Sequence, residues 1–420
     1  MKANLPAQQY PEAFLEAIPK SDLHLHLDGS LRLPTLIELA RERGVELPSN
    51  TPEGLLELVF KESYRDLPDY LHGFAYTCAV MTDAEALERV AYELAQDCLA
   101  EGVRYIEVRF APQLHVRPGF DVGQVIAAVD RGLARARQEH EASPAVAERG
   151  EPPFRYGIIT CAMRMFTGGF GPYYKDLVNV LQGWPPRQIY GVASLSLARA
   201  VIDARDRLGL PIVGFDLAGA EAGHPASDHV RAFRYAHQHF LKKTVHAGEA
   251  YGPESIFQAI TKLNADRIGH GTHLYSVELV QDEANAERYV EQLAEYISHR
   301  RVTLEVCITS NLQTMPFLDN DARRHPFGRM LRERLSVALC TDNRLVSRTT
   351  VTREIAQASA AFGLTPGELR TVAIHGFKRS FFPGTYREKR AYVRQVIDHY
   401  DQIAERHGFS VMKDRVADDE

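Results

Sequence analysis

The sequence has few cysteines, and none of them form a pair at redox or metal-binding spacing. Five occur in 420 residues. The number is odd, the spacing is wide and there is no C-x-x-C. Reduced thiols in a cytoplasmic protein explain this pattern most simply. The five are Cys78, Cys98, Cys161, Cys307 and Cys340.

Long apolar runs and basic clusters are also missing. No apolar run approaches the ~18 residues of a membrane span. The first 20 residues carry prolines and acids where a signal peptide needs an apolar core. The net charge is −6, without the stripe of basic and aromatic residues typical of nucleic-acid binding. We therefore expect a cytoplasmic protein with neither a membrane nor a nucleic acid as partner.

Eight short runs rich in Val, Ile and Leu alternate with longer helical patterns. Most end in a polar or glycine-containing turn, which is typical of buried parallel strands joined by helical crossovers. The runs cover residues 21–27, 103–112, 155–164, 211–219, 242–249, 266–274, 301–311 and 336–343. Helical patterns cover 82–102, where Thr82 and Glu85 match a capping box, 255–263 and 352–362.

This alternation predicts an α/β protein, a (β/α)8 TIM barrel. An open doubly wound sheet is the alternative, but no G-x-G-x-x-G follows the first strand. A barrel needs about 250 residues, so we expect one domain over 1–420 with insertions at 28–102 and 165–190. Both insertions follow strand ends and should cover the active face. Residues 139–153 look like a mobile surface loop. The insertions could also form contacts between subunits of a homo-oligomer.

Two histidines on the first strand are the first sign of chemistry. His24 and His26 alternate with leucines, and residues i and i+2 of a strand share a face. Two neighbouring buried imidazoles need a partner, which a metal or a carboxylate could provide. A second H-x-H, His237 and His239, lies in a helical pattern, where residues two apart point in different directions. It is therefore not a metal pair.

Further candidate ligands follow other strands, where a barrel displays its catalytic groups. His246 and Glu249 end the fifth strand, His270 and His273 the sixth, and Asp342 the eighth. His24, His26, His246 and Asp342 form a nitrogen-rich set suited to Zn²⁺, with iron, cobalt or nickel as alternatives. A lysine at the end of the fourth strand could be carbamylated and bridge two metals. This chain has Asp216 there instead, so we expect one metal per chain.

Six motifs in this order resemble the adenosine deaminase family of the amidohydrolase superfamily: HLHLDGS, DLAG, HAGE, RIGHG, TSNLQT and TDN. The resemblance spans roughly residues 18–385. It implies that His24, His26, His246 and Asp342 bind zinc, and that Asp342 also orients the attacking hydroxide. It further implies that Glu249 protonates purine N1 and that His270 faces the metal-bound water, either accepting its proton or stabilising the hydroxide.

The resemblance also implies the substrate contacts. Asp28 would hold a ribose hydroxyl, and the backbone of Gly219 would meet purine N3. Leu67, Tyr70, Leu71 and Phe74, from LPDYLHGF, would form an apolar lid. We expect Arg164, Asn311 and Thr314 to order the loops and His325 to lie away from the reaction.

The implied activity is deamination of a purine nucleoside. A metal-bound hydroxide would attack C6 of adenosine or 2′-deoxyadenosine, giving inosine or 2′-deoxyinosine and ammonia. Aminodeoxyfutalosine or adenine deaminase is the alternative with the same chemistry, and a non-catalytic purine-binding barrel is another. Taken singly, Glu249 could cap a helix near Pro253, His270 could be a core histidine, and Asp28 could form a turn with Gly29.

Two features depart from the family pattern. Many members carry a second aspartate where this chain has Asn343. An amide can donate directly to neutral purine N7, so we expect Asn343 to bind the substrate. The segment 165–190 is longer than the family pattern predicts, and it could be a substrate wall or a surface elaboration.

Overall fold

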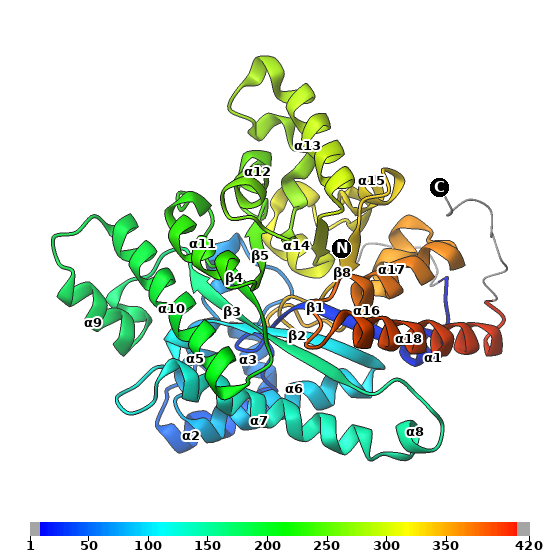
Figure 1. Cartoon of the computed structure of the whole chain (residues 1–420), viewed down its shortest axis with the longest axis horizontal. Coiled ribbons are helices and arrows are strands. Elements are labelled where there is room, and N and C mark those ends of the chain that lie inside the picture. The colour runs from blue at the N-terminus through cyan, green and yellow to red at the C-terminus, as the bar shows by residue number, and fades with distance from the viewer. Residues whose placement is uncertain (1–8, 410–420) are drawn as a thin grey trace.

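Eight parallel strands form the centre of the computed structural model, which describes residues 9–409 (Figure 1). They pair in sequence order, and the sheet closes where Leu25 of the first strand bridges Asp342 beyond the eighth. The predicted (β/α)8 barrel is therefore confirmed. The strands are β1 (Lys20–His26), β2 (Val103–Phe110), β3 (Arg155–Met163), β4 (Ile212–Ala218), β5 (Lys242–Ala247), β6 (Arg267–His270), β7 (Thr303–Val306) and β8 (Val337–Leu339).

The last three strands are shorter than the sequence pattern predicts. β6 ends at His270, whose φ of 63° is left-handed and cannot continue a strand. After β7 the chain enters a helix at Ile308, where the apolar pattern had predicted four more strand residues. Short apolar segments do not distinguish strand from helix by pattern alone.

Helices surround the barrel and cover its carboxyl-terminal face. They are α1 (Glu12–Ala17), α2 (Leu33–Arg43), α3 (Pro52–Leu58), α4 (Leu67–Leu71), α5 (Phe74–Val80), α6 (Ala84–Ala100), α7 (Val122–Glu141), α8 (Pro144–Ala147), α9 (Pro172–Val180), α10 (Pro186–Leu208), α11 (Val230–Gln238), α12 (Pro253–Lys262), α13 (Ala286–Arg300), α14 (Ile308–Thr314), α15 (Phe327–Arg332), α16 (Val351–Phe362), α17 (Pro366–Arg379) and α18 (Tyr386–Arg406). None of these helices is long and apolar enough to cross a membrane.

Helix caps explain where the predicted helices begin. The helices predicted at 82–102, 255–263 and 352–362 are α6, α12 and α16. The capping box predicted at Thr82 and Glu85 is wrong. Asp83 is the cap of α6, and its carboxylate accepts a hydrogen bond from the amide of Ala86 at 2.9 Å.

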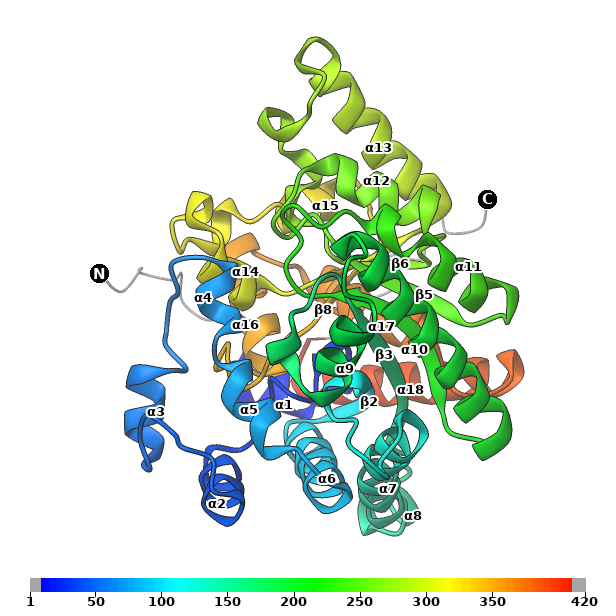
Figure 2. The same ribbon diagram turned by 90° about the vertical axis from the view of Figure 1, so that its left-hand side faces the viewer.

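The insertions contain short helices. The first insertion supplies α2 to α5, which run along one side of the barrel before the crossover helix α6 (Figure 2). The second contains α9 and the first turn of α10. The segment 139–153, predicted as a loop, carries the end of α7 and all of α8.

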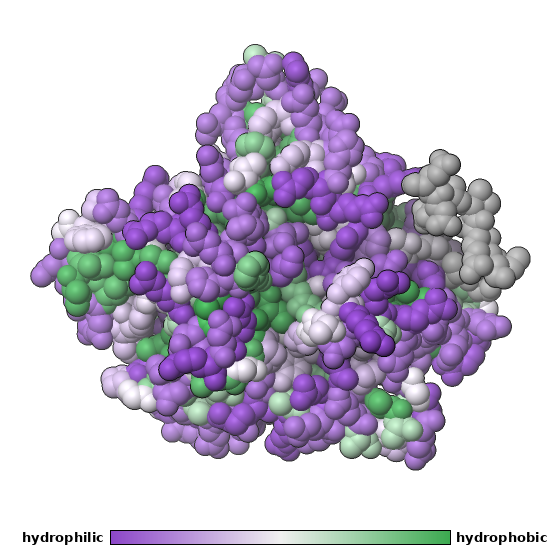
Figure 3. All heavy atoms as spheres, in the orientation of Figure 1, coloured by the Kyte–Doolittle hydropathy of each residue, from purple (hydrophilic) through white to green (hydrophobic). Residues whose placement is uncertain are grey.

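The second insertion packs through aromatic side chains and exposes others. The rings of Phe166 and Tyr174 are buried, with centroids 4.2 Å apart. Val180 and Trp184 stay 79% and 50% exposed. Hydrophobic atoms gather over α9 at the left edge of the surface in Figure 3. The insertion therefore has one face anchored on the barrel and one apolar face open to its surroundings.

Candidate active site

The four predicted metal ligands meet at the carboxyl end of the barrel. The Nε2 atom of His246 lies 3.0 Å from that of His24 and 3.1 Å from that of His26. The Oδ1 atom of Asp342 is 3.5 Å from the Nε2 atoms of both His24 and His26. Donor atoms from β1, β5 and the segment after β8, three parts of the chain that are far apart in the sequence, thus face one point. All four residues are buried.

Carboxylates behind the histidines fix which ring nitrogen carries the proton. Nδ1 of His24 lies 2.9 Å from Glu305, and Nδ1 of His246 lies 3.1 Å from Asp216. Each Nδ1–H donates to its carboxylate, so the lone pairs of both Nε2 atoms face each other. Unprotonated nitrogens 3.0 Å apart repel unless a cation lies between them. Tetrahedral Zn–N bonds would separate them by about 3.3 Å, so the residues fit a bound divalent metal.

Arg109 joins the two carboxylates beneath this group. Its guanidinium donates to Asp216 at 3.0 Å and to Glu305 at 2.8 Å, and all three side chains are fully buried. Burial alone would raise the pKa values of Asp216 and Glu305. The neighbouring cationic groups outweigh burial and hold both pKa values below their usual range. Both therefore stay ionised as hydrogen-bond acceptors.

Sequence reasoning missed Arg109 and Glu305. It used Asp216 only as evidence that the chain has no lysine at that position. The signal was present, because Arg109 and Glu305 interrupt strongly apolar strands. A charge inside a buried strand is costly unless it is paired. Two opposite charges on separate strands were therefore evidence for an ion pair inside the barrel.

Local backbone geometry at the strand ends makes room for the site. His270 and Asp342 adopt left-handed φ values of 63° and 61°. This conformation is costly for residues with a side chain and is concentrated at functional sites. Gly269 lies against His24, where an added Cβ would approach Cε1 to 2.9 Å. The glycine of the RIGHG motif thus leaves space for the His24 ring.

Glu249 follows β5 and faces His270. Its Oε1 atom lies 3.6 Å from Nε2 of His270, and both residues are buried. Burial raises the pKa of Glu249 to about 8, so it is a neutral acid at pH 7. It does not cap α12, whose cap is Gly252 without a side-chain hydrogen bond.

The backbone around Glu249 is held by an acid that sequence reasoning missed. Glu221, in the turn after β4, accepts hydrogen bonds from the amides of Gly248, Glu249 and Ala250 at 2.9, 3.0 and 2.6 Å. Its position in the AEAGH segment after a strand was the only clue in the sequence. The carboxylate fixes the loop that carries Glu249.

A chain of hydrogen bonds determines the proton position on His270. The amide of Phe327 donates to Nδ1 of His325 at 3.1 Å, so neutral His325 carries its proton on Nε2. That nitrogen lies 3.1 Å from Oδ1 of Asn311, which also accepts from Thr272 at 2.9 Å. The Asn311 amide therefore turns its NH₂ towards Nδ1 of His270, 3.1 Å away.

Neutral His270 consequently carries its proton on Nε2, the atom that faces Glu249. Burial lowers the pKa of His270 well below its usual range, which keeps the ring neutral. Its Nε2 has no hydrogen-bond partner among the described residues, since Glu249 at 3.6 Å is too far. Asn311 and His325 both stand behind His270: Asn311 contacts its ring and His325 contacts Asn311. The prediction that His325 lies away from the reaction is thus not contradicted, but its link to His270 was not foreseen.

Asp28 and the predicted lid residues lie over the same end of the barrel. Oδ1 of Asp28 is 3.9 Å from Nδ1 of His26, and burial raises the pKa of Asp28 to about 7. Phe74 packs 6.5 Å from the His26 ring, centroid to centroid. Leu67 and Tyr70 are buried, whereas Leu71 is half-buried. The first insertion thus contacts the candidate metal centre.

Asn343 links the lid to the barrel. Its amide donates to Oη of Tyr70 at 2.7 Å, and Tyr70 is 2.7 Å from the hydroxyl of Ser347. Gly29 packs against Asn343, where an added Cβ would lie 1.8 Å from Oδ1. One N–H of the amide remains for a ligand.

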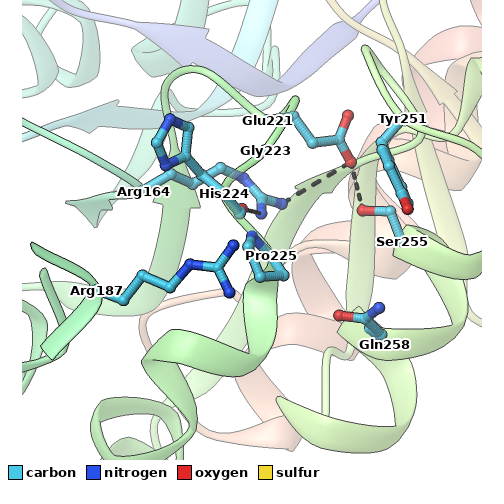
Figure 4. A pocket seen from close by; sticks show the side chains of 9 residues that line it. All are labelled: Arg164, Arg187, Glu221, Gly223, His224, Pro225, Tyr251, Ser255 and Gln258. Carbon is cyan, nitrogen blue, oxygen red and sulfur yellow. Dashed lines mark hydrogen bonds and ion pairs between the residues drawn. The ribbon is translucent and has the colours of Figure 1, made fainter. Parts of the chain in front are cut away.

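Arg164 and Gly219 border the site from β3 and β4. The guanidinium of Arg164 donates to the carbonyls of His224, at 2.7 Å, and of His246. Gly219 has a φ of 93°, which favours glycine. Both Arg164 and Glu221 line a pocket of about 180 Å³. Figure 4 shows Arg164 beside Glu221 in this pocket, with Arg187 pointing in from the other side.

Several histidines lie outside this centre. His273 follows β6 in a short 3-10 turn, and its Nδ1 pairs with Ser276 at 2.9 Å. His237 lies on the exposed side of α11, and His239 bonds the carbonyl of Tyr235. The prediction that this second H-x-H pair is helical holds for His237, whereas His239 is the residue that follows the last turn of α11. Thr314 bonds the carbonyl of Ser310, whose hydroxyl in turn donates to Oδ2 of Asp342 at 2.6 Å.

Known proteins resemble this chain along most of its length. The sequence model of the family described as adenosine deaminase matches residues 19–168 and 190–399. An adenosine deaminase from Mycobacterium bovis is 35% identical over 381 residues, covering 90% of this chain and 93% of the relative. Adenosine deaminase 1 from Streptomyces coelicolor is also 35% identical, covering 90% and 86%. The family match skips 169–189, most of the segment predicted to depart from the family.

Solved structures share the fold at lower identity. An adenine deaminase from Arthrobacter aurescens has a TM-score of 0.68 and 23% identity, covering 91% of this chain and 99% of that one. A zinc-bound amidohydrolase from Burkholderia ambifaria has a TM-score of 0.72 and 20% identity, covering 96% and 98%. The barrel, its buried His and Asp group and the family match agree. The chain belongs to the adenosine deaminase family and is a purine-deaminating hydrolase.

Proposed function

We propose that the chain hydrolyses adenosine and 2′-deoxyadenosine to inosine or 2′-deoxyinosine and ammonia. The observation that carries this proposal is the neutral acid Glu249 beside the Nε2–H of His270, next to four convergent metal ligands. Replacing an aromatic amine by water needs a nucleophile, a proton donor to the ring and a group that stabilises developing charge. The residues present suit these tasks: the four ligands would hold a metal that activates water, Glu249 would give the proton and His270 would stabilise the charge.

The metal is proposed to be one zinc ion held by His24, His26, His246 and Asp342. When bound, it supplies a nucleophilic water at neutral pH by lowering the pKa of that water. Nitrogen-rich tetrahedral sites suit zinc, and a structural neighbour was solved with bound zinc. Iron, cobalt and nickel accept the same ligands, so elemental analysis of the purified protein is the test.

Glu249 and His270, whose side chains lie 3.6 Å apart, act on neighbouring atoms of the substrate. Glu249 holds a proton near neutral pH and delivers it to purine N1 as electrons move onto the ring. His270 presents Nε2–H and donates to the oxygen that adds at C6, because Asn311 occupies its Nδ1. Of its two possible roles, stabilising the oxygen is therefore favoured over accepting a proton. Ser310 donates to Oδ2 of Asp342, orienting this carboxylate.

The remaining predicted residues form the substrate contacts. Asp28 binds a ribose hydroxyl, because one of its oxygens is buried without a partner among the described residues. The free N–H of Asn343 donates to purine N7, and the backbone of Gly219 meets N3. Leu67, Tyr70, Leu71 and Phe74 close over the purine and exclude water.

A purine panel tests the substrate. Adenosine, 2′-deoxyadenosine, adenine and aminodeoxyfutalosine are incubated with zinc-loaded protein, and ammonia release is measured. We expect both nucleosides to be turned over at least tenfold more efficiently than adenine, because only they have a ribose for Asp28. Preferred turnover of adenine would favour the second candidate, consistent with the structural neighbour named as an adenine deaminase. The chelated protein is the control.

We also propose a cytoplasmic location. All five cysteines are free, and Cys98, Cys161, Cys307 and Cys340 are buried. Reduced thiols persist in the cytoplasm. Fractionation of the source cells tests the location.

A further inference from the structure

A second group of potential metal ligands lies beside the proposed zinc centre. Asp28 follows β1, Cys78 is on the lid helix α5, and His115 follows the turn after β2. One ligand atom from each residue lies within 4.8 Å of the other two, and the Sγ atom of Cys78 is 3.9 Å from Oδ2 of Asp28. Three segments far apart in the sequence thus bring a thiol, a carboxylate and an imidazole together.

His115 is oriented as a metal ligand would be. Its Nδ1 lies 3.0 Å from the carbonyl of Met81, which can only accept, so Nδ1 carries the proton. Nε2 is therefore the nitrogen with the free lone pair, and it has no partner among the described residues although the side chain is fully buried. A backbone carbonyl on the other ring nitrogen is the usual support of a metal-binding histidine.

Asp28 also has an unused acceptor. Its Oδ1 is buried without a hydrogen-bond partner within residues 9–409. Nδ1 of His26 lies 3.9 Å from this oxygen, which is too long for a hydrogen bond. A metal would give both this oxygen and the Nε2 atom of His115 the partner that each lacks among the described residues.

We propose that Asp28, Cys78 and His115 bind a second divalent metal, with zinc as the preferred ion. Thiolate, imidazole and carboxylate are the usual ligand types of zinc, and three protein ligands leave a fourth position for water. In a tetrahedral site, Zn–S and Zn–O bonds place sulfur and oxygen about 3.6 Å apart, close to the 3.9 Å observed. On binding, the Cys78 thiol releases one proton to solvent and its sulfur bonds the metal.

Occupation of this site inhibits the enzyme. The metal joins α5 of the lid to the barrel and uses the carboxylate proposed to hold the ribose. This inhibitory effect rests on the proposed function, whereas the metal binding itself does not.

Cobalt distinguishes the two sites, because only the second contains sulfur. Metal-free full-length protein is titrated with Co²⁺, and the near-ultraviolet thiolate-to-cobalt absorption is followed. The four histidine and aspartate ligands give no such band when the first equivalent binds. We expect the band to appear with the second equivalent. A titration that saturates at two equivalents without it would overturn the proposal.

Variants assign the band. Cys78→Ser and His115→Phe should abolish the band or weaken binding of the second equivalent at least tenfold, while the first still binds. Binding of the first equivalent also shows that each variant has folded. Cys161→Ser is the matched control, because Cys161 is buried near Asp216, 3.5 Å away, and is not in the proposed group. A band that survives in Cys78→Ser but disappears in Cys161→Ser would overturn the assignment.

Inhibition is measured separately. Excess Zn²⁺ should raise the KM for adenosine at least tenfold in the wild type and less than twofold in Cys78→Ser. If the chain turns over no adenosine, the proposed function fails while the cobalt band still reports the second site. If the band is absent but adenosine is deaminated, only the second site is wrong.

Discussion

At the scale of single residues, the site depends on fixing where protons lie. Glu305 and Asp216 hold the Nδ1 protons of His24 and His246, which leaves both Nε2 lone pairs for a metal. Asn311 instead donates to Nδ1 of His270 and leaves a proton on Nε2. His24 and His246 can therefore bind a metal through Nε2, whereas His270 can donate a hydrogen bond through Nε2. The difference arises because the partners of their Nδ1 atoms differ.

Glu249→Gln tests the acid. Glutamine keeps the shape but cannot deliver a proton to N1, so kcat for adenosine should fall by roughly 10²–10⁴. The zinc content should remain at one per chain, because Glu249 is not among the proposed ligands. Steady-state ammonia release and elemental analysis measure the two quantities. Unchanged ammonia release would show that Glu249 does not transfer the proton.

The pH dependence of the reaction follows from the same residue. Burial raises the pKa of Glu249 to about 8, so its acid form is present below that pH and is lost as pH rises through it. The rate at saturating adenosine should therefore decline on the alkaline side. A bound cation would lower the midpoint, because it favours the carboxylate. A profile that rises steadily to pH 10 would contradict this role.

Asn311→Asp tests the proton position on His270. A carboxylate can only accept, so Nδ1 of His270 would donate to it and Nε2 would become an acceptor. We expect kcat to fall roughly 10²-fold, the loss typical of one stabilising donor, with KM nearly unchanged. Nitrogen-15 NMR of labelled histidines reads the tautomer directly. His325→Gln should retain the wild-type tautomer, since its amide can still donate to Asn311, and His237→Gln is the exposed control.

At the scale of elements, the lid is attached to the barrel through polar contacts. Tyr70 of α4 accepts from Asn343 and pairs with Ser347, both in the segment after β8. These contacts join an element near residue 70 to one near residue 345. The family resemblance implied an apolar lid from these residues, but it gave no information about these partners.

Tyr70→Phe tests this attachment. Losing the hydroxyl leaves the Asn343 amide without an acceptor in a buried place, which costs about 1–3 kcal/mol. The closed lid should become less populated, so KM for adenosine should rise about tenfold while kcat changes less than threefold. Tyr76→Phe, on the half-buried side of α5, is the control. Equal kinetics of Tyr70→Phe and the wild type would exclude a role for this contact in binding.

At the scale of the whole molecule, buried acids away from the site make stability depend on pH. Glu354 of α16 is buried and accepts from Thr309 and Thr349. Burial raises its pKa from 4.5 to about 7. Between these values the folded chain holds a proton that the unfolded chain has released, so stability decreases as pH rises through this window.

Glu354→Gln removes this titration. From pH 4.5 to pH 8, the wild type should lose roughly 3 kcal/mol of unfolding free energy relative to the variant, on the scale of 1.36 kcal/mol per pKa unit. Denaturant unfolding at several pH values measures the difference. A constant difference between the two proteins across the range would show that Glu354 stays ionised.

The sequence by itself determined the order of the strands, the barrel and the residues that end its strands. The spacing of apolar residues and the position of turn residues reveal them, because both depend on local chain geometry. His24, His26, His246, Glu249, His270 and Asp342 could be predicted since parallel strands bring their ends together. Tertiary structure alone decided the proton positions, through Glu305, Asp216 and His325. It alone also placed Cys78 and His115 beside Asp28, because hydrogen bonds and contacts across elements leave no periodic pattern in a sequence.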